Sequence, residues 1–232
     1  MALLDRSLLA DMPLFAGLGP AALDDIIAEA RSARVAKGAT VFEQDADATS
    51  FFVLLHGHLQ VLRITPAGAQ VIVRYVVPGE LFGIAVQMGR ATYPATALAV
   101  VDSVALSWSS IAWPRMMERF PSLAVGMMRT LGQRIDDAHG RVVEMSTEEV
   151  ERRVAHAILR LVKQAGRRGD RGITIDFPIS RQDVAEMTGT TLHTVSRILS
   201  GWETRGLVEG GRQKITVCDP HRLFLLAENR AE

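Results

Sequence analysis

Residues 180–217 read SRQDVAEMTGTTLHTVSRILSGWETRGLVEGGRQKITV, and this stretch decides the fold of the carboxyl-terminal part of the chain. Ser180 followed three residues later by Asp183 predicts a capped helix start. Gly189 supplies the left-handed backbone that a tight turn between two helices needs. Thr191 is a typical residue for capping a second helix. The stretch therefore predicts two helices joined by a short turn.

The second helix and the segment after it extend this pattern. One face of the helix is apolar and polar side chains occupy the other; the apolar residues are Val195, Ile198, Leu199 and Trp202. The following segment, LVEGGRQKITV, predicts two strands around a Gly-Gly turn. Helix, turn, helix and hairpin form a winged helix-turn-helix. Because an α-helix fits the major groove of B-DNA, this order predicts a DNA-binding domain.

Candidate DNA contacts lie on the polar face of the second helix and beside it. Arg197 carries a guanidinium fork that fits guanine O6 and N7. A backbone N–H at the helix start can bind a phosphate. Each polar residue alone would suit a solvated helix surface, but the whole arrangement favours DNA binding. The candidates are Arg181, Thr191, His193, Thr194, Ser196, Arg197 and Lys214, with Arg181 and Lys214 expected to contact phosphates.

The first half of the chain has a different pattern. Residues 20–31 predict a short helix that buries Leu23, Ile26 and Ile27. From about residue 34 to 106, short runs such as TVFEQ, FFVLLHG, AQVIVRYV and ATALAVVDSVALSW alternate with turn residues. Many short strands at near-regular spacing predict an antiparallel barrel or sandwich.

A long helical pattern follows, from about Pro114 to Met145. Its apolar residues recur at intervals of three and four, which suits either packing on the barrel or a homodimer seam; we favour the seam. Ser146 and Glu149 then match a capping box, which predicts that a new helix begins there. The candidate seam residues are Leu123, Met127, Met128, Leu131 and Ile135.

Composition excludes several classes of protein. The chain has 26 basic and 26 acidic residues, which argues against a protein that coats DNA through bulk charge. One cysteine, Cys218, rules out an internal disulfide and a site built from several thiolates. No signal peptide and no apolar run long enough to span a membrane is evident, so we expect a cytoplasmic protein with no membrane association. The sequence contains no catalytic motif, so we do not expect an enzyme.

On these motifs, the sequence resembles the CRP/FNR superfamily of transcription regulators over nearly its full length. The resemblance rests on FFVLLHGHLQV, VVPGELFG, the long Met-rich helix and SRQDVAEMTGTTLHTVSRILSGWETRGLV. It implies an α+β chain: a jelly-roll sensor of the cyclic-nucleotide-binding type (residues 1–113), a dimerisation helix (114–145) and a winged helix-turn-helix (146–232). It also implies a homodimer that binds a palindromic site in double-stranded DNA and, in an activator, contacts RNA polymerase.

The second helix of the motif, which is the recognition helix in this superfamily, indicates which branch of the superfamily the sequence resembles. FNR-like activators carry Glu-x-x-Ser-Arg, whereas this chain has His193 in place of Glu and retains Ser196 and Arg197. That pattern is similar to the nitric-oxide-responsive NnrR branch of denitrification regulators. The resemblance implies a response to nitric oxide, other nitrogen oxides or low oxygen. It further implies control of denitrification-type genes at a TTG-N8-CAA-like palindrome.

Three alternatives are open for the effector: nitric oxide or a related signal, a cyclic nucleotide, or no effector at all. Cyclic AMP receptors carry Arg-Ser or Arg-Thr after a Gly-Glu turn. Here Gly79 and Glu80 are present, but Ala91 separates Arg90 from Thr92, which argues against a cyclic nucleotide. The four candidate effector residues are Gly79, Glu80, Arg90 and Thr92. A regulator without any effector, controlled by its own abundance, is the third alternative.

A nitric oxide response implies haem, because neutral histidine is a good ligand for haem iron. His56 and His58, which flank Gly57 between two strands, are the candidate ligands, although each also suits an ordinary solvated histidine. The single cysteine excludes the iron–sulfur cluster of FNR. Cys218 is either a redox-sensitive thiol in the wing or, as we favour, a small apolar residue on a strand.

Overall fold

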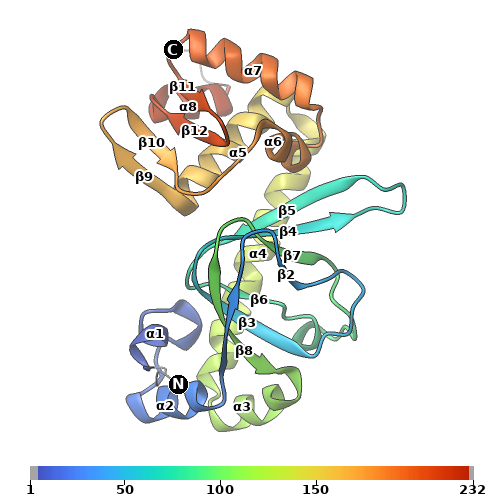
Figure 1. The fold of residues 1–232 in the computed structure, drawn as a ribbon, viewed down its shortest axis with the longest axis vertical. Coiled ribbons are helices and arrows are strands. Elements are labelled where there is room, and N and C mark those ends of the chain that lie inside the picture. Colours follow the sequence, from blue (N-terminus) through green and yellow to red (C-terminus); the bar gives the residue numbers. More distant parts are fainter. Residues whose placement is uncertain (1–4, 230–232) are drawn as a thin grey trace. The chain divides into compact units, whose positions relative to one another are not determined.

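The short apolar runs in the first half of the chain form antiparallel strands, as their spacing predicts. The computed structural model describes residues 5–229 (Figure 1). Two four-stranded sheets have the orders β1-β8-β3-β6 and β2-β7-β4-β5 and form the predicted sandwich. The strands are β1 (Arg31–Val35), β2 (Thr40–Phe42), β3 (Ser50–His56), β4 (Leu59–Ile64), β5 (Gln70–Val76), β6 (Leu81–Phe82), β7 (Thr96–Ala99) and β8 (Ser103–Ser109).

Contacts divide the chain into two units. The first holds residues up to Ile64 together with Tyr75–Ala138, and the second holds Thr65–Arg74 together with the residues from His139 onward. Within residues 5–229, no helix is both long and apolar enough to cross a membrane.

One core of the first unit lies between the sheet β1-β8-β3-β6 and several helices. These are α1 (Ser7–Ala10), η1 (Pro13–Phe15), α2 (Pro20–Ala28) and α3 (Trp113–Arg119). As predicted, α2 buries Leu23, Ile26 and Ile27. Trp108 is buried beside them, and its Nε1 donates a hydrogen bond to the Ile26 carbonyl at 2.8 Å. Figure 1 shows α1, α2 and α3 gathered around the first half of the long helix α4 (Ser122–Thr147).

A second core fills the inside of the sandwich with aromatic rings. Phe42 stacks on Tyr93 with ring centroids 3.9 Å apart, and Phe52 and Phe82 stack beside Phe42. The Tyr93 hydroxyl donates to the Ser50 carbonyl at 2.6 Å and accepts from the Ser50 N–H at 3.1 Å. Burial raises the pKa of the Tyr93 phenol above its usual value. The phenol therefore stays neutral and ties the aromatic stack to the start of β3.

Helix α4 has two apolar faces, and this corrects part of the predicted seam. Leu123 and Met127 are buried in the first unit's core, and Leu131 packs at its edge. Gly126 lets the helix approach closely, because a Cβ there would lie 2.5 Å from the Leu14 carbonyl oxygen. Leu123 and Met127 are therefore core residues, not free seam residues. Periodicity locates apolar faces but does not say what covers each of them.

The predicted continuous helix over residues 114–145 is also wrong. α3 ends at Arg119, and Phe120 adopts φ −130° and ψ 74° before α4 begins at Ser122. Pro121 explains the break, because the residue before a proline is disfavoured in the helical region.

The second unit combines helices with a four-stranded sheet of order β11-β12-β10-β9. The predicted local signals are confirmed. Ser180 and Asp183 form a capping box, Gly189 adopts φ 63°, and Thr191 caps the second helix. The elements are α5 (Val150–Ala165), β9 (Gly166–Gly169), β10 (Gly172–Ile175), α6 (Arg181–Thr188), α7 (Leu192–Thr204), β11 (Val208–Gly211), β12 (Lys214–Val217) and α8 (Pro220–Ala227).

Two local predictions in this unit are wrong. Ser146 does not cap a new helix: its Oγ donates to the Val142 carbonyl within the last turn of α4, and Glu149 precedes α5 without a side-chain cap. The wing turns at residues 212–213, not at the Gly-Gly pair. At Gly210, a Cβ would lie 2.3 Å from Glu203 Oε1, so a side chain there would displace the end of the Glu203 side chain.

Tyr93→Phe should destabilise the first unit by about 1–3 kcal/mol, because it leaves the Ser50 N–H and carbonyl without their partner while it keeps the stacked ring. Urea unfolding of the full chain measures the change, followed by tryptophan fluorescence, to which the buried Trp108 of the first unit contributes. An unchanged unfolding midpoint would contradict a structural role for this hydroxyl.

Candidate DNA-binding surface

Burial of one face of α7 determines which of its side chains project outward. Val195, Leu199 and Trp202 are each at most 2% exposed. The Trp202 Nε1 donates to Glu151 Oε1 at 2.7 Å, which fixes α7 to α5. Because the rotation per residue in a helix is constant, this anchoring leaves His193 and Arg197 exposed on the opposite side.

The start of α7 is held by two threonines. The Thr191 Oγ1 accepts a hydrogen bond from the Thr194 N–H at 3.2 Å, and the two hydroxyl oxygens lie 3.0 Å apart. This cap satisfies one of the free N–H groups of the first turn. The positive end of the helix dipole remains at the surface, where it favours an anion such as a phosphate.

Arg181 has a role that sequence reasoning missed. We expected a phosphate contact, but its guanidinium donates to Glu203 Oε1 at 2.9 Å and lies 3.5 Å from the Ser196 carbonyl. Glu203 in turn covers Gly210 of the wing. The three residues therefore connect α6, α7 and β11 and hold the two helices of the motif together.

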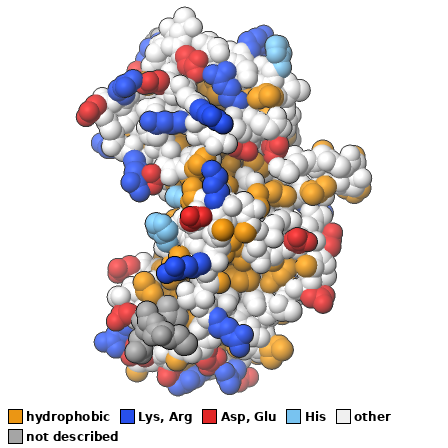
Figure 2. Space-filling view, viewed as in Figure 1, with side chains coloured by type: hydrophobic (Ala, Val, Ile, Leu, Met, Phe, Trp, Pro, Cys, Tyr) orange, Lys and Arg blue, Asp and Glu red, His pale blue; other side chains and the backbone are white. Residues whose placement is uncertain are grey.

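The basic side chains of this unit fall into two groups. Arg167 is paired with Asp176, and Arg171 with Glu209 at 2.7 Å. In contrast, Arg197, Arg212 and Lys214 are exposed, and among the described residues they form no ion pair. Figure 2 shows basic side chains interspersed with acidic and neutral ones rather than merged into one field.

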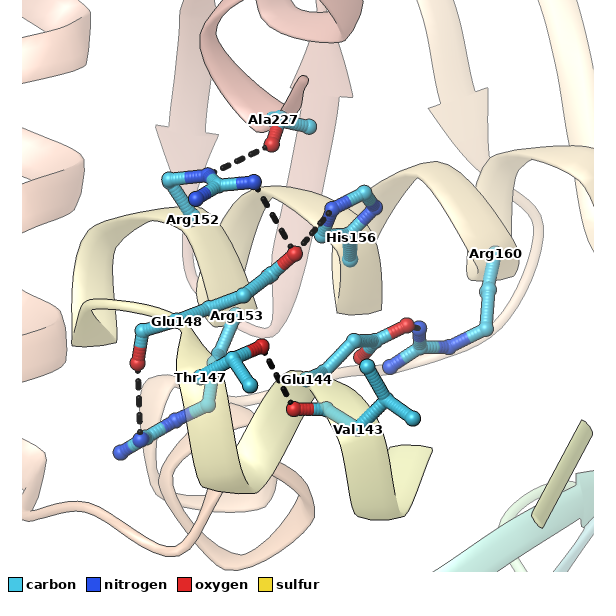
Figure 3. A network of polar contacts seen from close by, with 9 residues as sticks. All are labelled: Val143, Glu144, Thr147, Glu148, Arg152, Arg153, His156, Arg160 and Ala227. Carbon is cyan, nitrogen blue, oxygen red and sulfur yellow. Dashed lines mark hydrogen bonds and ion pairs between the residues drawn. The ribbon is translucent and has the colours of Figure 1, made fainter. Parts of the chain in front are cut away.

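A polar network joins the end of α4 to α5 and α8 (Figure 3). One oxygen of the Glu148 carboxylate accepts a hydrogen bond from Arg152 at 3.0 Å and lies 3.4 Å from His156 Nε2. The Arg152 Nε also donates to the Ala227 carbonyl at 2.8 Å. This network fixes the helix that carries Glu151, which anchors α7.

Comparisons with known proteins match both halves of the chain. The model for the Crp-like helix-turn-helix domain matches residues 152–225, and that for the cyclic nucleotide-binding domain matches residues 33–120. The transcriptional activator protein FnrA of Stutzerimonas stutzeri is 28% identical over 209 residues, which are 89% of this chain and 83% of that protein. The chain belongs to the CRP/FNR family of transcription regulators.

Other relatives agree with this assignment. The cyclic AMP receptor protein of Thermus thermophilus is 27% identical over 88% of this chain and 92% of that protein. The structure of FixK2 from Bradyrhizobium japonicum superposes with a TM-score of 0.75 at 20% identity, over 88% of this chain and 98% of that one. The relatives of this CRP/FNR regulator are transcription regulators and not enzymes, as the sequence predicts. Regulators of this family bind DNA through the helix-turn-helix and act as dimers.

The candidate effector residues of this CRP/FNR regulator lie on two loops that border β3. The Gly79 N–H donates to the Leu54 carbonyl, and the Leu54 N–H donates to the Glu80 carbonyl. The backbone of Gly79 and Glu80 is therefore paired with β3. Thr92 forms an isolated bridge with Asp47, just ahead of β3. Arg90 is exposed on the second loop. Whether these residues bind an effector stays a prediction.

The histidines and the cysteine are placed differently from one another. His56 is exposed at the end of β3, whereas His58 is buried. Cys218 follows β12 and is half-buried, and burial raises the pKa of its thiol. A raised pKa keeps the thiol protonated and unreactive, which favours the structural interpretation of Cys218. Among residues 5–229, no group of three or more metal-ligating side chains gathers.

Sequence reasoning also missed the β9–β10 hairpin and the exposure of Leu192. Gly166–Gly169 pairs with Gly172–Ile175 in an antiparallel hairpin that no motif discussed above predicts. Leu192 is 47% exposed at the start of α7. Its spacing of three residues to Val195 and seven to Leu199 places it beside the buried stripe, so no signal in the sequence indicates its exposure.

Arg181→Ala should lower the free energy of unfolding by about 1 kcal/mol, the upper range for a partly exposed ion pair. The reason is that it leaves the Glu203 carboxylate without its partner. Urea unfolding measures the effect, with Arg212→Ala as the matched control at an exposed, unpaired arginine. Equal unfolding midpoints for the two variants would contradict the proposed link between α6 and α7.

Proposed function

We propose that this chain is a dimeric regulator that reads a palindromic promoter site, with one α7 in the major groove of each half-site. The observation that carries the proposal is the exposed face of α7, where Arg197 and His193 project from a helix whose opposite face is buried. Such a helix reaches base edges with its first turns. Two copies placed about 34–36 Å apart match successive turns of the duplex.

The second apolar face of α4 supports the dimer. Val125, Met128, Ile135 and Val142 are between 53% and 72% exposed. Their spacings of three, seven and seven residues follow a heptad pattern, which is typical of a helix that packs against another helix. Of the predicted seam residues, Met128 and Ile135 thus remain available to a second copy of the chain.

We further propose a half-site with a TTG-like core. Arg197 provides a bidentate donor for guanine, and Ser196 lies beside it on the same helix. Both residues are shared with the FNR pattern, whereas His193 replaces its Glu. The base pair that His193 contacts would then differ from that of FNR-like sites.

For the stimulus we propose nitric oxide, another nitrogen oxide or low oxygen, with denitrification-type genes as targets. The resemblance of HTVSR to the NnrR branch supports this, as do relatives such as FnrA. We propose haem as the receptor for nitric oxide, because a neutral histidine is a good ligand for haem iron; of the two candidate ligands, His56 is exposed and His58 is buried. Repacking of α4 against its partner would then reorient the two α7 helices.

The alternative is a cyclic nucleotide. The match to the cyclic nucleotide-binding domain and the Thermus thermophilus relative favour it, whereas Ala91 between Arg90 and Thr92 opposes it. Two measurements on the purified chain separate these proposals. A Soret band that shifts with nitric oxide supports haem, and heat released on titration with cyclic AMP supports the nucleotide. A regulator without an effector would show neither and would bind DNA equally in all conditions.

Arg197→Ala should weaken binding to the palindrome by about 1–3 kcal/mol per half-site and relax the preference at one base pair. The reason is the loss of a bidentate contact to guanine. Fluorescence anisotropy with duplexes varied one base pair at a time measures both effects. Arg168→Ala, at an exposed arginine of β9, is the control. An unaltered footprint and base preference for Arg197→Ala would exclude the proposed contact.

His193→Glu should shift the preferred half-site toward the FNR type, because a carboxylate accepts a hydrogen bond from cytosine N4 whereas a neutral imidazole offers one donor and one acceptor. Selection from a randomised duplex library before and after the change shows the preference. An identical selected sequence would show that His193 does not contact bases.

A further inference from the structure

Leu192 is the first residue of α7 and is 47% exposed. The other large apolar side chains of the helix face the protein: Val195, Leu199 and Trp202 are buried and Ile198 is half-buried. Leu192 therefore presents an apolar group at the surface of a helix whose other exposed side chains are polar. The fold gives it no core to fill.

The position of Leu192 places this group at the reading end of the helix. Leu192 lies one turn before Ser196, so the two side chains are neighbours on one side of α7. Helical side chains tilt toward the amino terminus, so the Leu192 methyl groups extend toward the start of the helix. That start is the part of a recognition helix that meets base edges.

The cap of the helix is made without Leu192. Thr191 and Thr194 bond to each other through their hydroxyls and through the Thr194 N–H. A smaller residue at position 192 would leave this cap and the buried face of α7 in place. The leucine side chain is thus available for a contact outside the chain.

The major groove offers a matching apolar group. Of the features that base pairs present there, the 5-methyl of thymine is the apolar one, and side chains recognise it by contact rather than by hydrogen bonds. Burying a leucine side chain against that methyl removes both from water, which is favourable.

We propose that Leu192 packs on the 5-methyl group of a thymine in each half-site and so selects thymine at that position. This inference rests on the proposed reading of DNA by α7. It adds an apolar contact to the polar ones of Ser196 and Arg197, on the neighbouring part of the same helix face.

The test uses deoxyuridine, which differs from thymidine only in lacking the 5-methyl group. A duplex selected by the wild-type chain is prepared with each thymine replaced in turn, symmetrically in both half-sites. At one position per half-site, the replacement should weaken wild-type binding about fifteenfold, since one buried methyl is worth roughly fourfold and two are lost. Leu192→Ala should bind the thymine and deoxyuridine duplexes equally at that position.

Two control variants separate the contact from a change in the fold. Leu192→Met keeps an apolar side chain of similar volume and should retain most of the deoxyuridine penalty. Phe224→Ala removes a side chain that is 43% exposed on α8, and it should retain the whole penalty. All variants should share the unfolding midpoint of the wild-type chain within the scatter typical of surface substitutions.

Each result has a distinct meaning. A selected site that tolerates deoxyuridine at every thymine would overturn the Leu192 contact alone. A penalty that persists in Leu192→Ala would do the same, because the methyl would then be sensed by another residue or by the shape of the duplex. If no sequence is selected by the wild-type chain, reading of DNA by α7 is wrong, and the inference falls with it.

Discussion

The burial of Val195, Leu199 and Trp202 under α7 is the constraint on which the rest of the DNA-binding unit depends. Three fixed positions on a helix determine the direction of every other side chain on it. The Trp202–Glu151 hydrogen bond adds a fixed rotation relative to α5. The side chains proposed to contact bases therefore owe their outward direction to the hydrophobic core beneath α7.

The same reasoning applies to α4, which has an apolar face on each side. Leu123 and Met127 belong to the core of the sensor, whereas Met128 and Ile135 are exposed for a second copy. A shift in sensor packing would move one face, and because the helix is stiff the other face must follow. Met128 suits such a position, since a flexible thioether side chain tolerates more than one packing arrangement.

Much of the fold could be predicted where the deciding interactions are local. The Ser180 capping box, the Thr191 cap and the left-handed Gly189 involve residues within three or four positions of each other, so the sequence displays them directly. The Pro121 break was equally local and was readable, but the apolar periodicity across it outweighed the proline.

Several of the other errors involve partners that are distant in the sequence. Glu203 lies over Gly210 of the wing, and Arg181 turns inward because the carboxylate of Glu203 binds it. Leu123 and Met127 pack in a core that also includes the distant Phe15 and Trp108. No pattern within a window of ten residues contains that information. The exposed residues of the candidate site were predicted better than the contacts that hold α7 in place. Once the helix itself is predicted correctly, its exposed polar residues follow from the periodicity of the sequence.

The balanced charge of the chain bears on how such a site works. Binding of DNA through phosphates alone scales with the number of cations that touch the duplex. Here several arginines are already paired within the protein, as Arg171 is with Glu209, and the exposed unpaired ones near α7 are few. Weak attraction to random sequence leaves more of the total affinity to contacts with bases. With few phosphate contacts, the proposed mode of binding would depend for its selectivity on the residues at the start of α7.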